Sequence, residues 1–161
     1  MAEATIGTDG AVETITVTAT NASKTSTTNT EYTATSTKAV TLKDVDTTKT
    51  SVTVPATVKV GNKSFKVTAI AKNALSGNKK ITKVTIGKNV KKIGANAFKG
   101  DKKLKTVEIK GVVKTVGKNA FKGINKNATI TIKASAKNYK KTVKAIKKSG
   151  IAKTVKFKRA K

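Results

Sequence analysis

A period of 23 residues in the middle of the chain constrains the fold more than any other feature of the sequence. Apolar residues recur at this spacing, as Ile70, Ile93 and Val116 do. A longer motif recurs with them, as TAIAKNALSG at 68–77, KKIGANAFKG at 91–100 and KTVGKNAFKG at 114–123. Units this short cannot bury an apolar face alone, so a period of about 20–30 residues indicates a solenoid of stacked coils.

Within each coil the sequence predicts one short strand and tight corners. Residues 107–109 and 130–132 alternate apolar and polar side chains, which is typical of a strand with one buried face. Ala97 and Phe98 recur at the period and are expected to be core residues. Glycines such as Gly100 recur as well, and they allow the backbone to turn at corners. The expected fold class is therefore mainly β, a short solenoid of 23-residue repeats.

Polar sequence of low complexity precedes the repeats. Threonine makes up 17 of the first 50 residues, and residues 21–38 contain almost nothing to bury. We expect residues 1–30 to be a linker-like segment of a longer surface protein, with a strand at 12–20 on the solenoid or in a preceding domain. Residues 58–67 then predict a β-hairpin that caps the first coil, with Gly61 and Asn62 at its turn.

The C-terminal part predicts a capping helix and a final strand. Ser135 suits the N-cap and Gly150 the position past the end, while Tyr139, Val143 and Ile146 form an apolar stripe. The lysines on the other face would also suit a helix on an anionic membrane, but the narrow stripe without Trp or Leu favours the cap. The expected divisions are lead-in strands and hairpin at 31–67, repeats at 68–133, helix at 135–149 and a last strand at 152–158.

The chain is strongly basic, with 35 Lys and Arg residues against 8 Asp and Glu residues. Residues 1–50 have a net charge of −2, whereas residues 51–161 contain 31 basic and two acidic residues, a net charge of +29. An anionic partner would therefore meet the repeats. No apolar run approaches the roughly 18 residues that a membrane span needs.

Many lysines of the repeats keep the 23-residue register. The candidate binding residues are the lysines of these rows: Lys79, Lys80, Lys91, Lys99, Lys102, Lys103, Lys114, Lys122 and Lys126. Residues one period apart stack at roughly 4.7–4.9 Å in a solenoid, inside a Debye length of about 8–10 Å, so their charges repel. One interpretation is that solvated lysines keep a repetitive β edge soluble. The other is a basic ladder that matches a repeating polyanion, such as cell-wall teichoic acid or a host glycosaminoglycan.

The residue types needed for common catalytic and metal sites are missing from the sequence. Histidine and cysteine are absent, which removes the usual general base, the usual nucleophile pairs and the zinc ligands. No glycine-rich phosphate-binding loop occurs. Asp101 and Glu108 are the only acids of the repeats, and we expect each to be a solvated surface group. The sequence therefore predicts no enzyme activity, no catalytic residues, no metal site and no cofactor.

The repeats resemble the BspA-like leucine-rich repeats of bacterial surface and secreted proteins. The pattern L-x-x-V-x-I followed by V-x-x-I-G-x-x-A-F-x-G carries the resemblance, most closely at 81–100 and 104–123, and it extends over about residues 31–161. Where the family often has a cysteine after the glycine, this chain has Asn78, Asp101 and Ile124, so no role of that cysteine carries over. The resemblance implies a leucine-rich-repeat domain for adhesion or recognition at a cell surface, with no catalytic residues to transfer.

From the resemblance and the charge we expect a non-catalytic module, secreted or at a bacterial cell surface, that binds proteins or anionic polymers through its basic repeats. The expected partners are a cell-wall polymer, a host glycan or a host protein. The alternatives are a nucleic-acid or general polyanion binder and a structural cell-wall attachment module. A net charge of +29 on residues 51–161 also predicts nonspecific, salt-sensitive binding of nucleic acid in vitro, although few aromatic residues are present to stack on bases.

Overall fold

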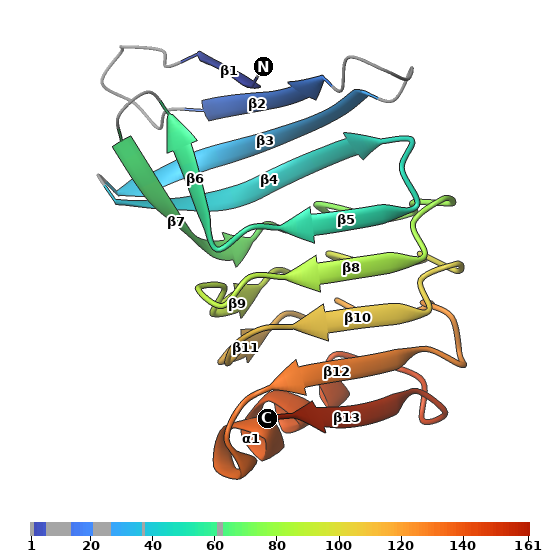
Figure 1. The fold of residues 1–161 in the computed structure, drawn as a ribbon. Helices are drawn as coiled ribbons and strands as arrows, with labels where there is room; N and C mark the ends of the chain where they lie inside the picture. The colour runs from blue at the N-terminus through green and yellow to red at the C-terminus, as the bar shows by residue number, and fades with distance from the viewer. Residues whose placement is uncertain (1, 6–13, 21–26, 37, 61–62) are drawn as a thin grey trace.

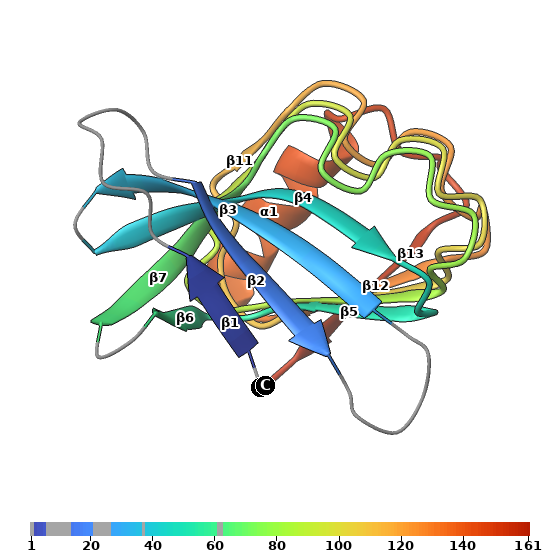
Figure 2. The same ribbon diagram turned by 90° about the horizontal axis from the view of Figure 1, so that it is seen from above.

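The computed structural model describes residues 2–5, 14–20, 27–36, 38–60 and 63–161. The described chain forms two β-sheets that line a solenoid, with one helix at the C-terminal end (Figure 1). One sheet has eight strands and the other has five. Seen from above, the coils of the repeats follow nearly the same path, one on top of another (Figure 2).

The five-stranded sheet is parallel throughout and carries the sequence period. Its strands, from one edge to the other, are β5 (Ser51–Val54), β8 (Lys83–Ile86), β10 (Thr106–Ile109), β12 (Thr129–Lys133) and β13 (Lys156–Ala160). Val107 pairs with Val84 on one side and with Ile130 on the other. All three side chains are fully buried, which confirms the predicted strands and their register.

The eight-stranded sheet lines the opposite side of each coil with strands that pair in parallel. These strands are β4 (Ala39–Thr47), β7 (Lys63–Ile70), β9 (Lys92–Ile93) and β11 (Thr115–Val116). β6 (Thr57–Val60) pairs antiparallel with β7, so the expected hairpin is present, although Gly61 and Asn62 lie outside the described residues. Because β4 also pairs with β7, the sheet continues beyond the hairpin.

A connecting segment without regular strands closes each coil between the two sheets. Its backbone bonds to the coil that follows, as the Asn96 N–H does to the Lys118 carbonyl at 3.0 Å. Asn73, Asn96 and Asn119 adopt φ angles of 62°, 58° and 59°, in the left-handed region that asparagine tolerates better than most residues. The corners that the sequence assigned to glycine are therefore shared between asparagine and glycine in every coil.

The residues before the repeats extend the eight-stranded sheet. β1 (Ala2–Thr5), β2 (Thr14–Thr20) and β3 (Thr27–Ser36) pair antiparallel in sequence order, and β3 pairs with β4. The strand expected at 12–20 corresponds to β2, and the residues described before and after it also lie in strands. Threonine is β-branched and suits a pleated strand, and backbone pairing to a neighbouring strand does not depend on apolar side chains.

Helix α1 (Ala136–Lys147) covers the C-terminal end of the solenoid. The Ser135 hydroxyl accepts a hydrogen bond from the Asn138 N–H at 3.4 Å, so the predicted N-cap is confirmed. Ile146 is fully buried, and Thr142 Oγ1 donates to the Val113 carbonyl at 3.3 Å. These contacts fix the helix on the last coil, as the capping interpretation requires. Within the described part of the chain, no helix is long and apolar enough to cross a membrane.

The last strand begins later than the sequence suggested. β13 starts at Lys156, whereas the expected start was residue 152. Residues 153–154 form a turn in which the Val155 N–H donates to the Ala152 carbonyl at 3.2 Å. This turn is further fixed because Thr154 Oγ1 donates to the Lys126 carbonyl at 2.6 Å.

Candidate binding surface

All nine lysines singled out from the sequence are exposed, and they fall into three rows along the solenoid. The first row contains Lys91 and Lys114, directly before β9 and β11. The Lys114 N–H donates to the Lys91 carbonyl at 2.8 Å, so these two residues are neighbours on adjacent coils. Two ammonium groups therefore extend from points that lie closer together than a Debye length, about 8–10 Å.

The second row lies in the turns that lead into β8, β10 and β12. Its lysines are Lys79, Lys80, Lys102, Lys103 and Lys126. The turns are stacked by side chains as well as by backbone, since Asn125 Nδ2 donates to the Lys102 carbonyl at 3.2 Å. The first row follows the ends of β8 and β10, whereas the second row precedes their starts. The two rows therefore flank the five-stranded sheet and do not form one patch.

Lys99 and Lys122 form the third row, in the segment that closes each coil. Their carbonyls accept hydrogen bonds from Gly77 and Gly100, at 2.8 Å and 2.9 Å. This row lies between the other two around the coil. A linear polyanion that runs parallel to the solenoid axis would contact one row at a time, whereas a polyanion that wraps around a coil could contact all three.

A further row of lysines in register was not predicted. Lys110 directly follows β10 and Lys133 is the last residue of β12, and both are exposed. Since Ile109 pairs with Ile132, these two lysines stand on neighbouring strands. The same 23-residue spacing that revealed the other rows could have revealed this one.

The exposed face of the five-stranded sheet contains the single acid that interrupts the basic surface of the repeats. Glu108 lies between Thr85 and Thr131 in the sheet register. Its Oε2 is 3.9 Å from Lys83 Nζ, with both side chains about half exposed. An exposed pair of this kind contributes little to stability, about 0–1 kcal/mol, and leaves the surrounding lysines uncompensated.

Asp101 is buried, which corrects the expectation that it is a solvated surface group. Its Oδ1 accepts a hydrogen bond from the Asn78 N–H at 2.8 Å, across to the preceding coil. Its Oδ2 is buried and has no hydrogen-bond partner among the described residues. Ile124 occupies the same position in the next repeat and is also buried, so the repeat places this position inside the solenoid.

Burial raises the pKa of the Asp101 carboxyl from 3.8 to about 7, although the backbone N–H groups of Asn78 and Gly77 lower it in part. Desolvation disfavours the charged carboxylate more than two backbone donors favour it. A general acid near neutral pH would need access to a substrate, and this side chain is fully buried. We therefore assign Asp101 a role in coil packing and not in chemistry.

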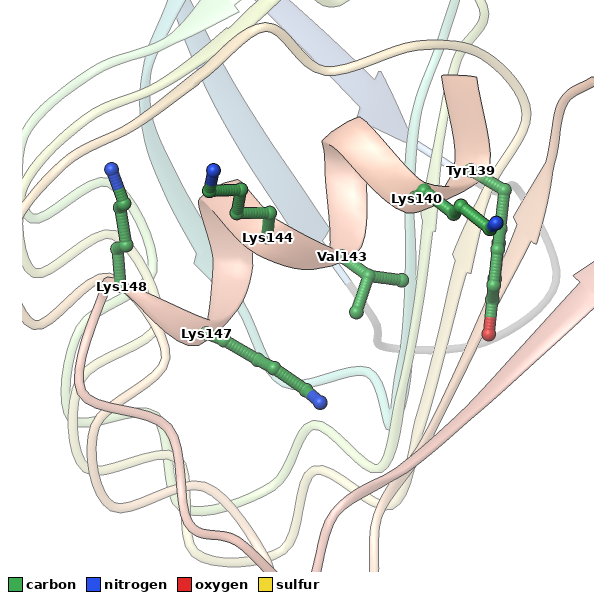
Figure 3. Close-up of a pocket in the computed structure, with 6 residues that line it drawn as sticks. All are labelled: Tyr139, Lys140, Val143, Lys144, Lys147 and Lys148. Atoms are coloured by element: carbon green, nitrogen blue, oxygen red, sulfur yellow. The ribbon is translucent and has the colours of Figure 1, made fainter. Parts of the chain in front are cut away.

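A hollow of about 460 Å³ lies along the outer side of α1 (Figure 3). Tyr139 and Val143, which are half-buried, contribute its apolar surface. Four lysines border it, at Lys140, Lys144, Lys147 and Lys148. Lys147 Nζ lies 5.7 Å from the centre of the Phe157 ring, a cation–π distance that ties the helix to β13. The predicted apolar stripe is thus only partly covered, because Ile146 enters the core while the other two residues stay at its border.

The described residues contain no group of three or more His, Cys, Asp or Glu side chains that could hold a metal ion. Histidine and cysteine are absent from the whole sequence. The exposed lysines are therefore the chemically distinctive groups of this surface.

Known proteins share both the repeat pattern and the fold. Residues 68–146 match the sequence profile of the BspA type leucine rich repeat region, in 6 copies. A leucine rich cell surface protein from Faecalibacterium prausnitzii A2-165 is similar in structure, with a TM-score of 0.58 and 24% identity; the match covers 73% of this chain and 32% of that one. This chain therefore spans about a third of that protein, and the likeness supports the leucine-rich-repeat fold.

Two further structures match less closely. A leucine-rich repeat protein from Bacteroides ovatus has a TM-score of 0.49 and 20% identity, covering 65% of this chain and 36% of that chain. A leucine-rich repeat protein from Bacteroides capillosus has the same score and identity, covering 80% of this chain and 93% of that chain. No curated protein matches the sequence.

Proposed function

Residues 68–146 belong to the BspA-type leucine-rich repeats, and we propose that this protein is a non-catalytic recognition module that acts outside the cell by binding anionic polymers. The observation that carries the proposal is the set of exposed lysine rows on a domain with a net charge of +29. We also propose that the module is located at a bacterial surface. A structural neighbour described as a cell surface protein supports that location.

The lysine rows favour a polymer over a small ion because their charges repel one another. Backbone hydrogen bonds hold Lys91 and Lys114 on adjacent coils, so the repulsion cannot be relieved by moving the chain. A polyanion that spans several lysines would neutralise them together and release its own condensed counterions. Teichoic acid and sulfated glycans have repeating charges of this kind.

Nucleic acid is the second candidate, since its phosphates would meet the same lysines. Proteins that bind single strands also stack bases on exposed aromatic rings. Phe98 and Phe121 are fully buried and unavailable for stacking. We therefore expect nucleic acid to bind through charge alone, without sequence preference and no more tightly than other polyanions of equal charge density.

The proposal is tested by titrating the protein with purified teichoic acid, heparin and double-stranded DNA at several salt concentrations. We expect teichoic acid or heparin to bind, with an affinity that falls steeply as salt rises. Absence of binding to either polymer at low salt would contradict the proposal, and the lysines would then serve solubility. A clear preference for DNA over both polymers would favour the second candidate.

A further inference from the structure

A second hollow, of about 370 Å³, lies on the outer face of the five-stranded sheet, where its first strands end. Thr53 and Thr85 border it from neighbouring positions on β5 and β8, and Pro55 borders it just after β5. Three lysines, Lys88, Lys110 and Lys133, also line it, together with Val54, Ala56 and Gly87. None of these three lysines belongs to the lysine rows predicted from the sequence.

The hollow exists because the position after each strand holds different side chains in successive coils. Val54 pairs with Ile86, and the next residues are Pro55 and Gly87. Proline has only a short ring, and glycine has no side chain. In the next two coils the same position holds Lys110 and Lys133. Small residues thus leave space over two coils, and two long basic side chains stand beside that space.

The walls of the hollow are fixed by backbone contacts between coils. The Gly87 N–H donates to the Val54 carbonyl at 2.8 Å, and Asn89 Nδ2 donates to the Ala56 carbonyl at 2.9 Å. A Cβ on Gly87 would lie 2.5 Å from the Ala56 nitrogen, so the two coils approach too closely for any other residue there. The site is therefore formed before a ligand binds, which lowers the entropic cost of binding.

The electrostatics of the hollow favour an anion. Lys88, Lys110 and Lys133 are all exposed at its border. The one exposed acid of the repeats, Glu108, precedes Lys110 by two residues and lies 3.9 Å from Lys83 Nζ. Three lysines thus border the hollow, and Glu108, which is not part of its lining, is already paired with a fourth lysine, which leaves a net positive charge at the site.

We propose that this hollow binds one acidic sugar unit, a monosaccharide ring that carries a carboxylate. The lysines would bind the anionic group, and the hydroxyls of Thr53 and Thr85 would bond to sugar hydroxyls. The aliphatic surface of Pro55 would pack on the ring. A bare phosphate would leave this apolar surface unused, whereas pockets with apolar walls and a few placed polar groups are typical of organic ligands.

The inference rests on the proposed function and adds to it a defined subsite, distinct from the three lysine rows. A polymer could contact the rows through charge alone, but the hollow would select for the ring that carries the charge. The subsite and the rows are therefore separable by experiment, because Lys110 and Lys133 line the hollow and belong to none of the three rows.

The test is an NMR titration of the isotope-labelled protein with trigalacturonate as the acidic probe and maltotriose as the neutral probe of equal length. Two charge-matched variants are compared with the parent: Lys110→Gln with Lys133→Gln at the hollow, and Lys137→Gln with Lys141→Gln on the exposed side of α1. A Thr53→Val variant removes one hydroxyl at constant charge. Heparin binding by the same proteins is measured in parallel.

We expect trigalacturonate to shift the amide signals of Thr53, Ala56 and Gly87, and maltotriose to leave them unchanged. The hollow variant should bind trigalacturonate at least about fivefold more weakly than the α1 variant, and Thr53→Val should weaken it about twofold to threefold. Equal losses in the two charge-matched variants, or shifts confined to other residues, would overturn the subsite. If heparin binds while trigalacturonate does not, the subsite fails and the proposed function stands. If neither binds, both fail.

Discussion

The rings of Phe98 and Phe121 stack between adjacent coils, with centroids 5.0 Å apart and ring planes inclined by 14°. Both side chains are fully buried. The first copy of the motif has Leu75 at this position, which is also buried. One row of large apolar side chains therefore runs along the solenoid and joins three coils, as the sequence period predicts.

Replacing Phe98 by Ala should destabilise the protein by about 3–5 kcal/mol, because it removes a buried ring and leaves a cavity between coils. Phe98→Leu introduces the residue that the first copy has at this position. It should destabilise the protein less than Phe98→Ala, since leucine fills more of the cavity than alanine does. Urea unfolding measures both changes. Lys99→Ala, at the next and exposed position, serves as the control, and a Phe98→Ala effect no larger than this control would mean that the coils do not stack in this register.

Asp101→Asn should stabilise the protein at alkaline pH and lose this stabilising effect at acidic pH. The raised pKa of the buried carboxyl, about 7 against 3.8, means that the folded protein binds more protons than the unfolded chain between these pH values. The free energy of unfolding of the parent therefore falls as pH rises from about 4 to 7, by an amount on the order of 4 kcal/mol. The asparagine retains an oxygen for the Asn78 N–H but cannot ionise.

Denaturant unfolding of the parent and of Asp101→Asn at pH 4.5 and pH 8 checks this prediction. The variant should be more stable than the parent at pH 8 and should lose that advantage at pH 4.5. All other ionisable groups are the same in both proteins, so their contribution cancels in the difference. If the difference in the free energy of unfolding between parent and variant is the same at pH 4.5 and pH 8, the Asp101 carboxyl does not titrate with a raised pKa.

Two glycines of the repeats should respond differently to alanine. A Cβ on Gly94 would lie 2.5 Å from the Lys72 nitrogen, so Gly94→Ala must push two coils apart and should destabilise by several kcal/mol, on the order of other overpacked cores. Gly77 has a φ of 75° and nothing within 4 Å of such a Cβ. Gly77→Ala should therefore destabilise the protein only by the free energy of holding alanine in the left-handed conformation, about 1–2 kcal/mol. Thermal unfolding measures both variants, and similar losses of stability in Gly94→Ala and Gly77→Ala would contradict the close approach of the coils at Gly94.

The sequence predicts the repeating part of this fold well because each coil imposes the same spacing on the next. The row of Ile86, Ile109 and Ile132 could be read directly from the period, and all three are buried and paired. Residues before the repeats carry no such constraint. The strand expected at 12–20 corresponds to β2, but no such pattern marked β1, where pairing of the backbone decides the structure and leaves little trace in side-chain composition.

The candidate site was predictable only in part. The lysine rows follow from the period, but the hollow at Pro55 and Gly87 depends on which side chains are small at one corner, and this becomes visible only when the coils are stacked. The burial of Asp101 had a signal in the sequence, since Ile124 occupies the same position one period later. Charge was the misleading feature, because an acid is usually exposed unless its group is paired.

Binding of a polyanion by lysines in register is distinguished from attraction by net charge when variants of equal net charge are compared. One variant changes five lysines of the first two rows to Gln: Lys80, Lys91, Lys103, Lys114 and Lys126. The other changes five exposed lysines near the C-terminus that lie outside these rows: Lys137, Lys141, Lys144, Lys156 and Lys158. Thermal unfolding of both variants first establishes that each is folded.

The decisive measurement is the affinity of the two variants for the polymer that the parent binds, teichoic acid or heparin, titrated at the same ionic strength. Stacked lysines that a polymer neutralises together should make the variant in the rows bind about tenfold or more weakly than the C-terminal variant, with a shallower dependence of affinity on salt. Equal losses of affinity and equal salt dependence in the two variants would contradict the claim, because they would show that net charge alone attracts the polymer.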